Sequence, residues 1–101
     1  MNEELTMINM EIVAKVGEAK SLFIEAIDLV MENNQEEAEI KLKEGKKIFN
    51  EGHKAHAKLL TKMASGEEII PDMFTIHAQC QIMSAEDFVL IAQKVIKYTN
   101  K

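Results

Sequence analysis

Few side chains in this sequence are suited to chemistry near neutral pH: three histidines and a single cysteine. His77 and Cys80 lie three residues apart in segment 77–83, which reads HAQCQIM, and His53 and His56 have the same spacing earlier in the chain. A neutral imidazole is both a nucleophile and a metal ligand, and a thiolate also binds metals. His77 is the leading candidate for a reactive group, because the rest of the chain is poor in such groups.

A zinc site is one alternative. Two histidine or cysteine pairs at i,i+3 spacing supply three imidazoles and a thiolate, which is a tetrahedral donor set if the helices that carry them face each other at the same height. Spacings of this kind also arise by accident, and a histidine on an apolar face, such as His56, is more often hydrogen-bonded in a core or between chains. No ordered Ser/His/Asp set, glycine-rich phosphate loop or paired carboxylate motif is present, so nothing supports a hydrolase.

Two amphipathic helices are predicted from the first part of the chain. Apolar residues alternate in steps of four and three over about residues 3–32 and again from about Gln35. Asn33-Asn34 ends the first helix, and the segment 65–68 ends the second. The predicted apolar seams are Ile12, Val16, Ala19, Phe23, Ala26 and Val30 in the first helix and Ala38, Leu42, Gly45, Phe49, Gly52, His56, Leu59 and Met63 in the second.

A third helix is predicted from Pro71 to about Tyr98, since the fixed φ of proline suits the first helical position and its missing donor is not needed there. His77 would then lie about two turns into this helix. The apolar residues of the helix form two stripes that are offset by a stutter. The first stripe is Ile76, Cys80 and Met83, and the second is Phe88, Ile91, Val95 and Tyr98.

The predicted fold is all-α, with three long helices in an antiparallel up-down-up bundle about 45 Å long. Residues 1–101 form one domain. Gly45 and Gly52 lie on the seam of the second helix and predict a close helix approach, which would offset their unfavourable helix propensity. Residues 1–32 have a net charge of −5 and residues 33–64 of +2, so we expect the acidic first helix to lie against the basic second.

Composition excludes several classes of protein. The net charge is −5 and every basic residue is lysine, so no guanidinium can bind phosphates or base edges in bidentate fashion, and nucleic acid is not an expected partner. The acidic start of the chain and the absence of a long apolar run argue against a signal peptide and membrane insertion. One cysteine cannot form an internal disulfide, which agrees with a cytoplasmic location.

Segment 77–83 resembles the histidine-alanine-glutamine-aspartate-histidine-leucine-methionine signature of the lactose/cellobiose-specific enzyme IIA components of the bacterial sugar phosphotransferase system. The similarity covers about residues 15–99 and includes Gly17-Glu18-Ala19-Lys20, Glu25-Ala26, Glu37-Ala38-Glu39 and His53-Lys54. The resemblance implies a three-helix protomer that forms a homotrimer and carries a phosphoryl group on His77. It also implies two partners, the carrier protein HPr as donor and a sugar-specific enzyme IIB, which has an acceptor cysteine.

Two positions depart from the signature. Cys80 replaces the aspartate, and Gln81 replaces the second histidine. In the family, the aspartates of three protomers gather around a divalent cation at the trimer axis. A neutral thiol in each protomer would remove the three carboxylate charges that repel one another, so neither a metal site nor another cofactor is expected here. Gln79 and Gln81 are expected to donate amide hydrogen bonds to the phosphoryl group, and Gln81 at i+4 shares a helix face with His77.

The sequence thus predicts a cytoplasmic phosphohistidine carrier for uptake of a disaccharide of the lactose, cellobiose or chitobiose class. Two alternatives stay open. One is a non-catalytic regulatory or interaction module on the same fold, and the other is the zinc-binding helical bundle.

Overall fold

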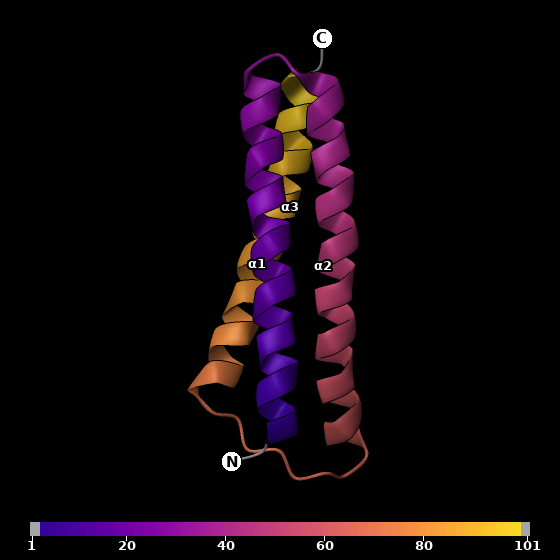
Figure 1. The fold of residues 1–101 in the computed structure, drawn as a ribbon, viewed down its shortest axis with the longest axis vertical. Helices are drawn as coiled ribbons and strands as arrows, with labels where there is room; N and C mark the ends of the chain where they lie inside the picture. The colour runs from indigo at the N-terminus through magenta and orange to yellow at the C-terminus, as the bar shows by residue number, and fades with distance from the viewer. Residues whose placement is uncertain (1–2, 100–101) are drawn as a thin grey trace.

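The structure, a computed structural model, describes residues 3–99, and this part of the chain forms three long helices without strands (Figure 1). Helix α1 spans Glu3–Met31, α2 spans Gln35–Ala64 and α3 spans Met73–Thr99. Consecutive helices run in opposite directions, so the predicted all-α, up-down-up arrangement is confirmed. The bundle measures 52 × 20 × 16 Å, as expected for helices of 27 to 30 residues that rise about 1.5 Å per residue.

Two asparagines make the turn between α1 and α2, as the sequence predicts. Asn33 has a φ of 65°, in the left-handed region that asparagine tolerates better than most residues. Asn34 is the N-cap of α2, and its side-chain oxygen accepts a hydrogen bond from the backbone N–H of Glu37 at 3.3 Å. The turn therefore ends one helix and begins the next within three residues.

The predicted seam of α1 lies at the centre of the core, and all six of its positions are buried. The seam of α2 is confirmed at five positions, since Ala38, Gly45, Phe49, Gly52 and Leu59 are buried. At two others, Leu42 and His56, the side chains are half-buried. The prediction is wrong at Met63, which is 48% exposed. In Figure 1, α3 begins on the far side of α1, so the last turns of α2 are covered from one side.

The two seam glycines allow α1 and α2 to approach closely. A Cβ atom on Gly45 would lie 2.7 Å from Cε1 of Phe23, and one on Gly52 would lie 2.8 Å from Cγ2 of Val16. Both distances are shorter than side chains tolerate without moving. The packing reason predicted for these glycines is therefore confirmed.

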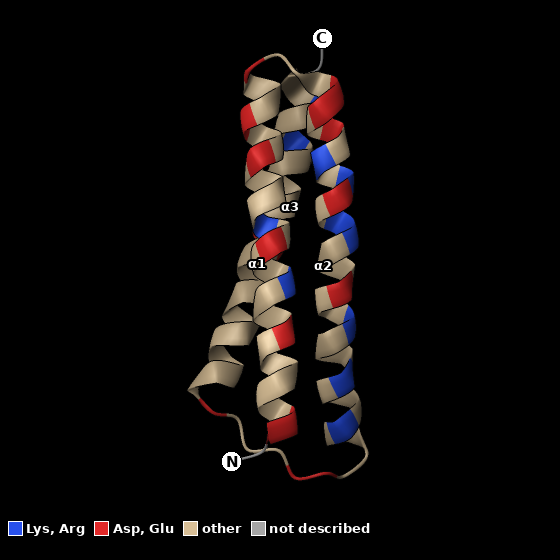
Figure 2. Cartoon of the chain, viewed as in Figure 1, with Lys and Arg blue, Asp and Glu red and all other residues tan. Residues whose placement is uncertain are grey.

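Opposite charges connect the same two helices (Figure 2). Lys15 of α1 lies 2.9 Å from Glu51 of α2, and Lys58 of α2 lies 3.8 Å from Glu11 of α1. The hydrogen bond between Lys15 and Glu51, together with their charges, raises the pKa of the lysine and lowers that of the glutamate. The expected placement of the acidic first helix against the basic second is confirmed.

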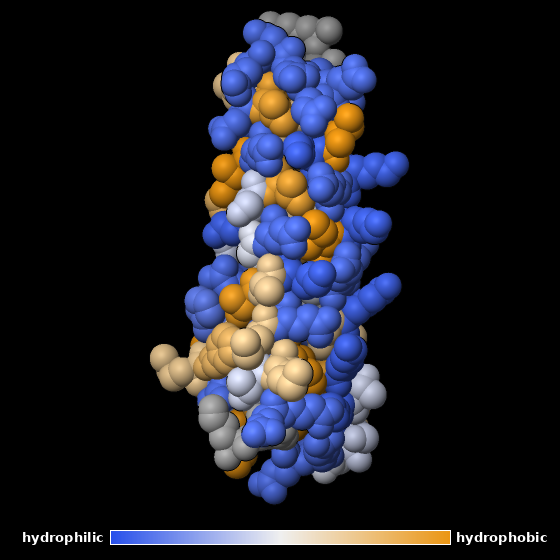
Figure 3. Space-filling model, in the orientation of Figure 1, coloured by the Kyte–Doolittle hydropathy of each residue, from blue (hydrophilic) through white to orange (hydrophobic). Residues whose placement is uncertain are grey.

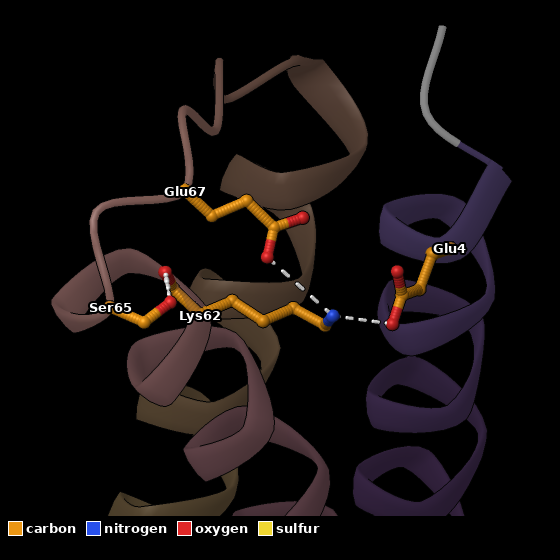
Figure 4. A network of polar contacts seen from close by, with 4 residues as sticks. All are labelled: Glu4, Lys62, Ser65 and Glu67. Carbon is orange, nitrogen blue, oxygen red and sulfur yellow. Dashed lines mark hydrogen bonds and ion pairs between the residues drawn. The ribbon is translucent and has the colours of Figure 1, made fainter.

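Lys62 joins three parts of the chain at the end of α2 (Figure 4). Its ammonium lies 2.5 Å from Glu4 of α1 and 3.7 Å from Glu67 of the following connection. Its backbone carbonyl accepts a hydrogen bond from the Ser65 hydroxyl at 2.8 Å. The hydrogen bond to Glu4 is the main reason that the pKa of Lys62 is raised. These contacts hold the start of the α2–α3 connection near the N-terminal end of α1.

Helix α3 begins at Met73, so the prediction that Pro71 is its first residue is wrong. Asp72 is the N-cap: its carboxylate accepts the backbone N–H of Thr75 at 2.8 Å, and its carbonyl accepts the N–H of Ile76 at 3.1 Å. An aspartate in this position satisfies one of the N–H groups that a helix start leaves unpaired. The helix begins after the cap, and Pro71 precedes it.

The face of α3 that enters the core lies only partly along the predicted stripes. Helix α3 packs mainly against α1 and little against α2. Small side chains such as Ala78 and Ala85 let it lie close to α1. The first predicted stripe lies outside the core of the single chain, whereas Phe88 and Val95 of the second stripe pack against the core. The buried residues are Ala78, Ile82, Ala85, Ala92 and Ile96, whereas Ile76, Cys80, Met83, Ile91 and Tyr98 are exposed and Phe88 and Val95 are half-buried.

Candidate functional site

His77 is the fifth residue of α3, and its side chain is exposed. It lies closer to the helix start than predicted, because α3 begins two residues later than Pro71. The backbone N–H groups and the helix dipole favour negative charge near a helix N-terminus, although the effect falls off within the first turn. An anionic group on His77 would lie just beyond that turn.

A buried polar network fixes the first turn of α3 to α1. Asn9 of α1, which is 0% exposed, donates a hydrogen bond from Nδ2 to the hydroxyl of Thr75 at 2.9 Å. The Thr75 hydroxyl in turn donates to Asp72 at 2.9 Å. The two hydrogen bonds from Thr75, first that of its backbone N–H, lower the pKa of the Asp72 carboxyl. Thr75 is two residues before His77.

Sequence reasoning missed this network, although one signal was available. The four-three spacing of the α1 seam, continued backwards from Ile12, arrives at Asn9 and then Leu5. A polar residue at a seam position has to find a partner in the core, which is what Asn9 does. The partner itself, on a helix 66 residues away, is visible only in the folded chain.

The other predicted site residues lie around His77 on α3. Gln81 is half-buried and stands at i+4, on the same face as His77. Gln79 is exposed, and its i+2 spacing turns it away from that imidazole, so within one chain it is poorly placed to reach the same group. Cys80 is a free, exposed thiol at i+3.

The zinc donors suggested by the sequence are not brought together. His53 of α2 contacts the ring of Phe49, with centroids 4.6 Å apart, and lies 3.8 Å from Glu86 of α3. Glu86 follows His77 by nine residues, about 13 Å along a helix. Within residues 3–99, no three histidine, cysteine or acidic side chains are grouped closely enough to hold a metal ion.

The imidazole of His77 lies at the exposed surface of α3. An open groove of about 870 Å³ lies between α1 and α2, lined by residues that include Met7, Glu11 and Lys58, and His77 does not line it. An exposed imidazole on a well-anchored helix is accessible to an electrophile that another protein presents.

Comparison with known proteins decides the family. A sequence model of the family described as "PTS system, Lactose/Cellobiose specific IIA subunit" matches residues 7–100. The chain belongs to this family. As a IIA subunit it is a component of a phosphotransferase system that acts in sugar uptake.

Relatives of known name agree with this assignment. The IIA subunit is 33% identical over 82 residues to the lactose-specific EIIA component of Staphylococcus aureus (strain N315), which covers 81% of this chain and 80% of the relative. Its fold matches the crystal structure of PtcA from S. mutans with a TM-score of 0.95 and 34% identity over 100% of both chains. The PTS cellobiose-specific enzyme IIA from Bacillus anthracis matches with a TM-score of 0.92 and 25% identity, over 98% of this chain and 90% of that one.

Within the part of the chain that the structure describes, no helix of the IIA subunit is both long enough and apolar enough to cross a bilayer.

Proposed function

We propose that His77 of this IIA subunit accepts a phosphoryl group from HPr and passes it to a sugar-specific enzyme IIB in the cytoplasm, during uptake of a disaccharide of the lactose, cellobiose or chitobiose class. The supporting observation is that His77, in the segment that resembles the family signature, is exposed on a helix whose first turn is fixed to α1. This component would not touch the sugar, so the sugar is set by its partners.

In the first transfer, the unprotonated ring nitrogen of His77 attacks the phosphorus of a phosphohistidine on HPr. A nitrogen–phosphorus bond forms on His77 as the one on HPr breaks, and the electron pair of the broken bond stays on the HPr imidazole. A cysteine thiolate of enzyme IIB attacks the same phosphorus in the second transfer, and His77 is released as a neutral imidazole. Such transition states are loose and rich in charge, so positioning and hydrogen-bond donors matter more than a strong base.

The amide of Gln81 is the donor best placed to contact the phosphoryl oxygens from within the same chain, because it shares the face of His77. Gln79 points to another side of α3, so its amide would act only if the phosphoryl group or a neighbouring chain lies there. The proposal assigns no metal and no other cofactor to either transfer.

The IIA subunit is proposed to act as a homotrimer. Ile76, Met83 and Leu90 are 53%, 57% and 57% exposed and follow one another at intervals of seven residues along α3. A heptad of apolar residues is typical of a helix that packs against copies of itself. Apolar side chains also gather on one face of the molecule, over the lower half of α1 and the first turns of α3 (Figure 3). Their exposure in a single chain supports burial between protomers.

Incubation with enzyme I, HPr and phosphoenolpyruvate tests the proposal. Intact mass measurement is expected to find one acid-labile phosphoryl group per chain on the natural protein and on His53→Ala, and none on His77→Ala. Phosphorylation of His77→Ala would place the reaction elsewhere, and failure of the natural protein would favour a non-catalytic module. Sedimentation equilibrium is expected to give three chain masses, and a single chain mass at micromolar concentration would contradict the homotrimer.

A further inference from the structure

Asn9 is a polar residue in a position that the fold reserves for apolar side chains. Leu5, Asn9, Ile12 and Val16 follow one another in steps of four and three, and all four are buried. The Oδ1 atom of Asn9 has no hydrogen-bond partner in the part of the chain that the structure describes. An unpaired buried acceptor costs folding free energy, so core stability does not explain an asparagine in this place.

The hydrogen bonds of Asn9 have a defined direction. The Thr75 hydroxyl has one hydrogen, which it donates to Asp72, and it accepts the Nδ2 hydrogen of Asn9 on a lone pair. Asn9 is therefore joined through Thr75 to the residue that caps α3. This connection fixes where the first turn of α3 lies along α1.

The first turns of α3 pack mainly against one other helix, α1. They lie beside α1 and away from α2 (Figure 1), and α3 makes few contacts with α2 overall. The buried side chains of this half of the helix are Ala78, Ile82 and Ala85, so Ile82 is the one large apolar side chain among them. Apolar contacts allow a helix to slide, whereas a buried asparagine with one partner sets the register between helices.

We infer that Asn9 and Thr75 are positioning residues for His77: their hydrogen bond holds the start of α3 in one register on α1, and so places the imidazole for phosphoryl transfer. This inference rests on the proposed function of His77. Transfer between two proteins is sensitive to such placement, because a displacement of about 1 Å at the reacting atom can cost on the order of a hundredfold in rate.

Asn9→Leu separates positioning from stability. Leucine has the same number of side-chain heavy atoms and branches at the same carbon, so it fills the space, removes the unpaired acceptor and leaves the Thr75–Asp72 hydrogen bond in place. We expect an unchanged or higher urea midpoint, an HPr KM within about twofold of the natural value, and a kcat for phosphoryl uptake that falls about tenfold or more. A purely structural role for Asn9 predicts no loss of kcat when stability is kept.

Thr75→Val is the second variant, in case leucine does not fit at position 9. It removes the hydroxyl that accepts from Asn9 and is expected to lower kcat by a similar factor. Thr75→Ser keeps a hydroxyl at this position, so its kcat is expected to stay near that of the natural protein. Thr99→Val is the matched control, since Thr99 ends the same helix and, among residues 3–99, its hydroxyl bonds to Val95 and Ile96 of that helix.

Hydrogen exchange provides a readout that does not depend on the reaction. In both Asn9→Leu and Thr75→Val, we expect faster amide exchange at residues 76–81 and natural rates in the second half of α3. Natural kcat and natural exchange in both variants would overturn the inference while leaving the role of His77 intact. If the natural protein is not phosphorylated at all, the proposed function fails, and the exchange rates alone decide whether Asn9 sets the register.

Discussion

Replacing Gly45 with alanine tests how tightly α1 and α2 pack. The added Cβ would meet Cε1 and Cδ1 of Phe23 at 2.7 and 2.9 Å and Cβ of Leu22 at 3.2 Å. The ring of Phe23 is 0% exposed and stands edge-on to Phe49, with centroids 6.2 Å apart, so it has little room to move. To reach ordinary contact, the ring or the helix must shift by about 0.7 Å.

The expected free energy follows from two opposing contributions. Alanine is favoured over glycine inside a helix by about 1 kcal/mol. Overpacking a filled core costs about 1–3 kcal/mol. Gly45→Ala is therefore expected to lower the free energy of unfolding by between about 0 and 2 kcal/mol, despite the better helix former.

Gly17→Ala is the matched control, because a Cβ on Gly17 would meet no atom within 4 Å in this chain. Gly17→Ala has the same gain in helix propensity but no clash with Phe23. Its free energy of unfolding, measured by urea denaturation, should therefore exceed that of Gly45→Ala by about 1–3 kcal/mol. Combining Gly45→Ala with Phe23→Leu is expected to recover part of the free energy of unfolding that Gly45→Ala loses, and a double-mutant cycle measures this coupling. Equal stabilities for the two alanine variants would refute the close approach of α1 and α2 at Gly45.

Two further predictions concern ions and protons at α3. If three Cys80 thiols converge in the proposed homotrimer, magnesium added to the chelated protein should leave its melting temperature unchanged. The melting temperature of Cys80→Asp, in contrast, should depend on magnesium. A magnesium-dependent rise in the melting temperature of the natural protein would contradict this prediction. The pKa of Asp72 is lowered on folding from its ordinary value of 3.8, so its contribution to stability is complete above that value and is lost as pH falls through the lower folded value. The melting temperature of Asp72→Ala should thus lie below that of the natural protein near neutrality and approach it in strong acid, and a gap that does not depend on pH would argue against this cap.

Much of the fold could be predicted because local chemistry determines it. The seam of α1, the asparagine turn and the pairing of an acidic with a basic helix follow from the order of residues along the chain. The two seam glycines of α2 also predicted a close contact, because glycine is unfavourable inside a helix and close packing offsets that cost. The segment that contains His77 was recognisable for the same reason, since its residues are contiguous.

Only the tertiary structure decided which face of α3 enters the core and where that helix begins. Ile76 and Met83 are larger than Ala78 and Ala85, but the close contact with α1 admits the two alanines and leaves Ile76 and Met83 exposed. The choice depends on the distance between helices, which no single helix encodes.

The surroundings of the candidate site were decided in the same way. The sequence identifies His77, but it does not reveal that Asn9 reaches Thr75, or that His53 lies beside Glu86 and away from His77. A hydrogen bond between residues 66 positions apart exists only once two helices have taken a common register. The proposed reactive group, His77, can therefore be identified from the sequence, whereas its position is set by packing between helices, because register depends on contacts that form only on folding.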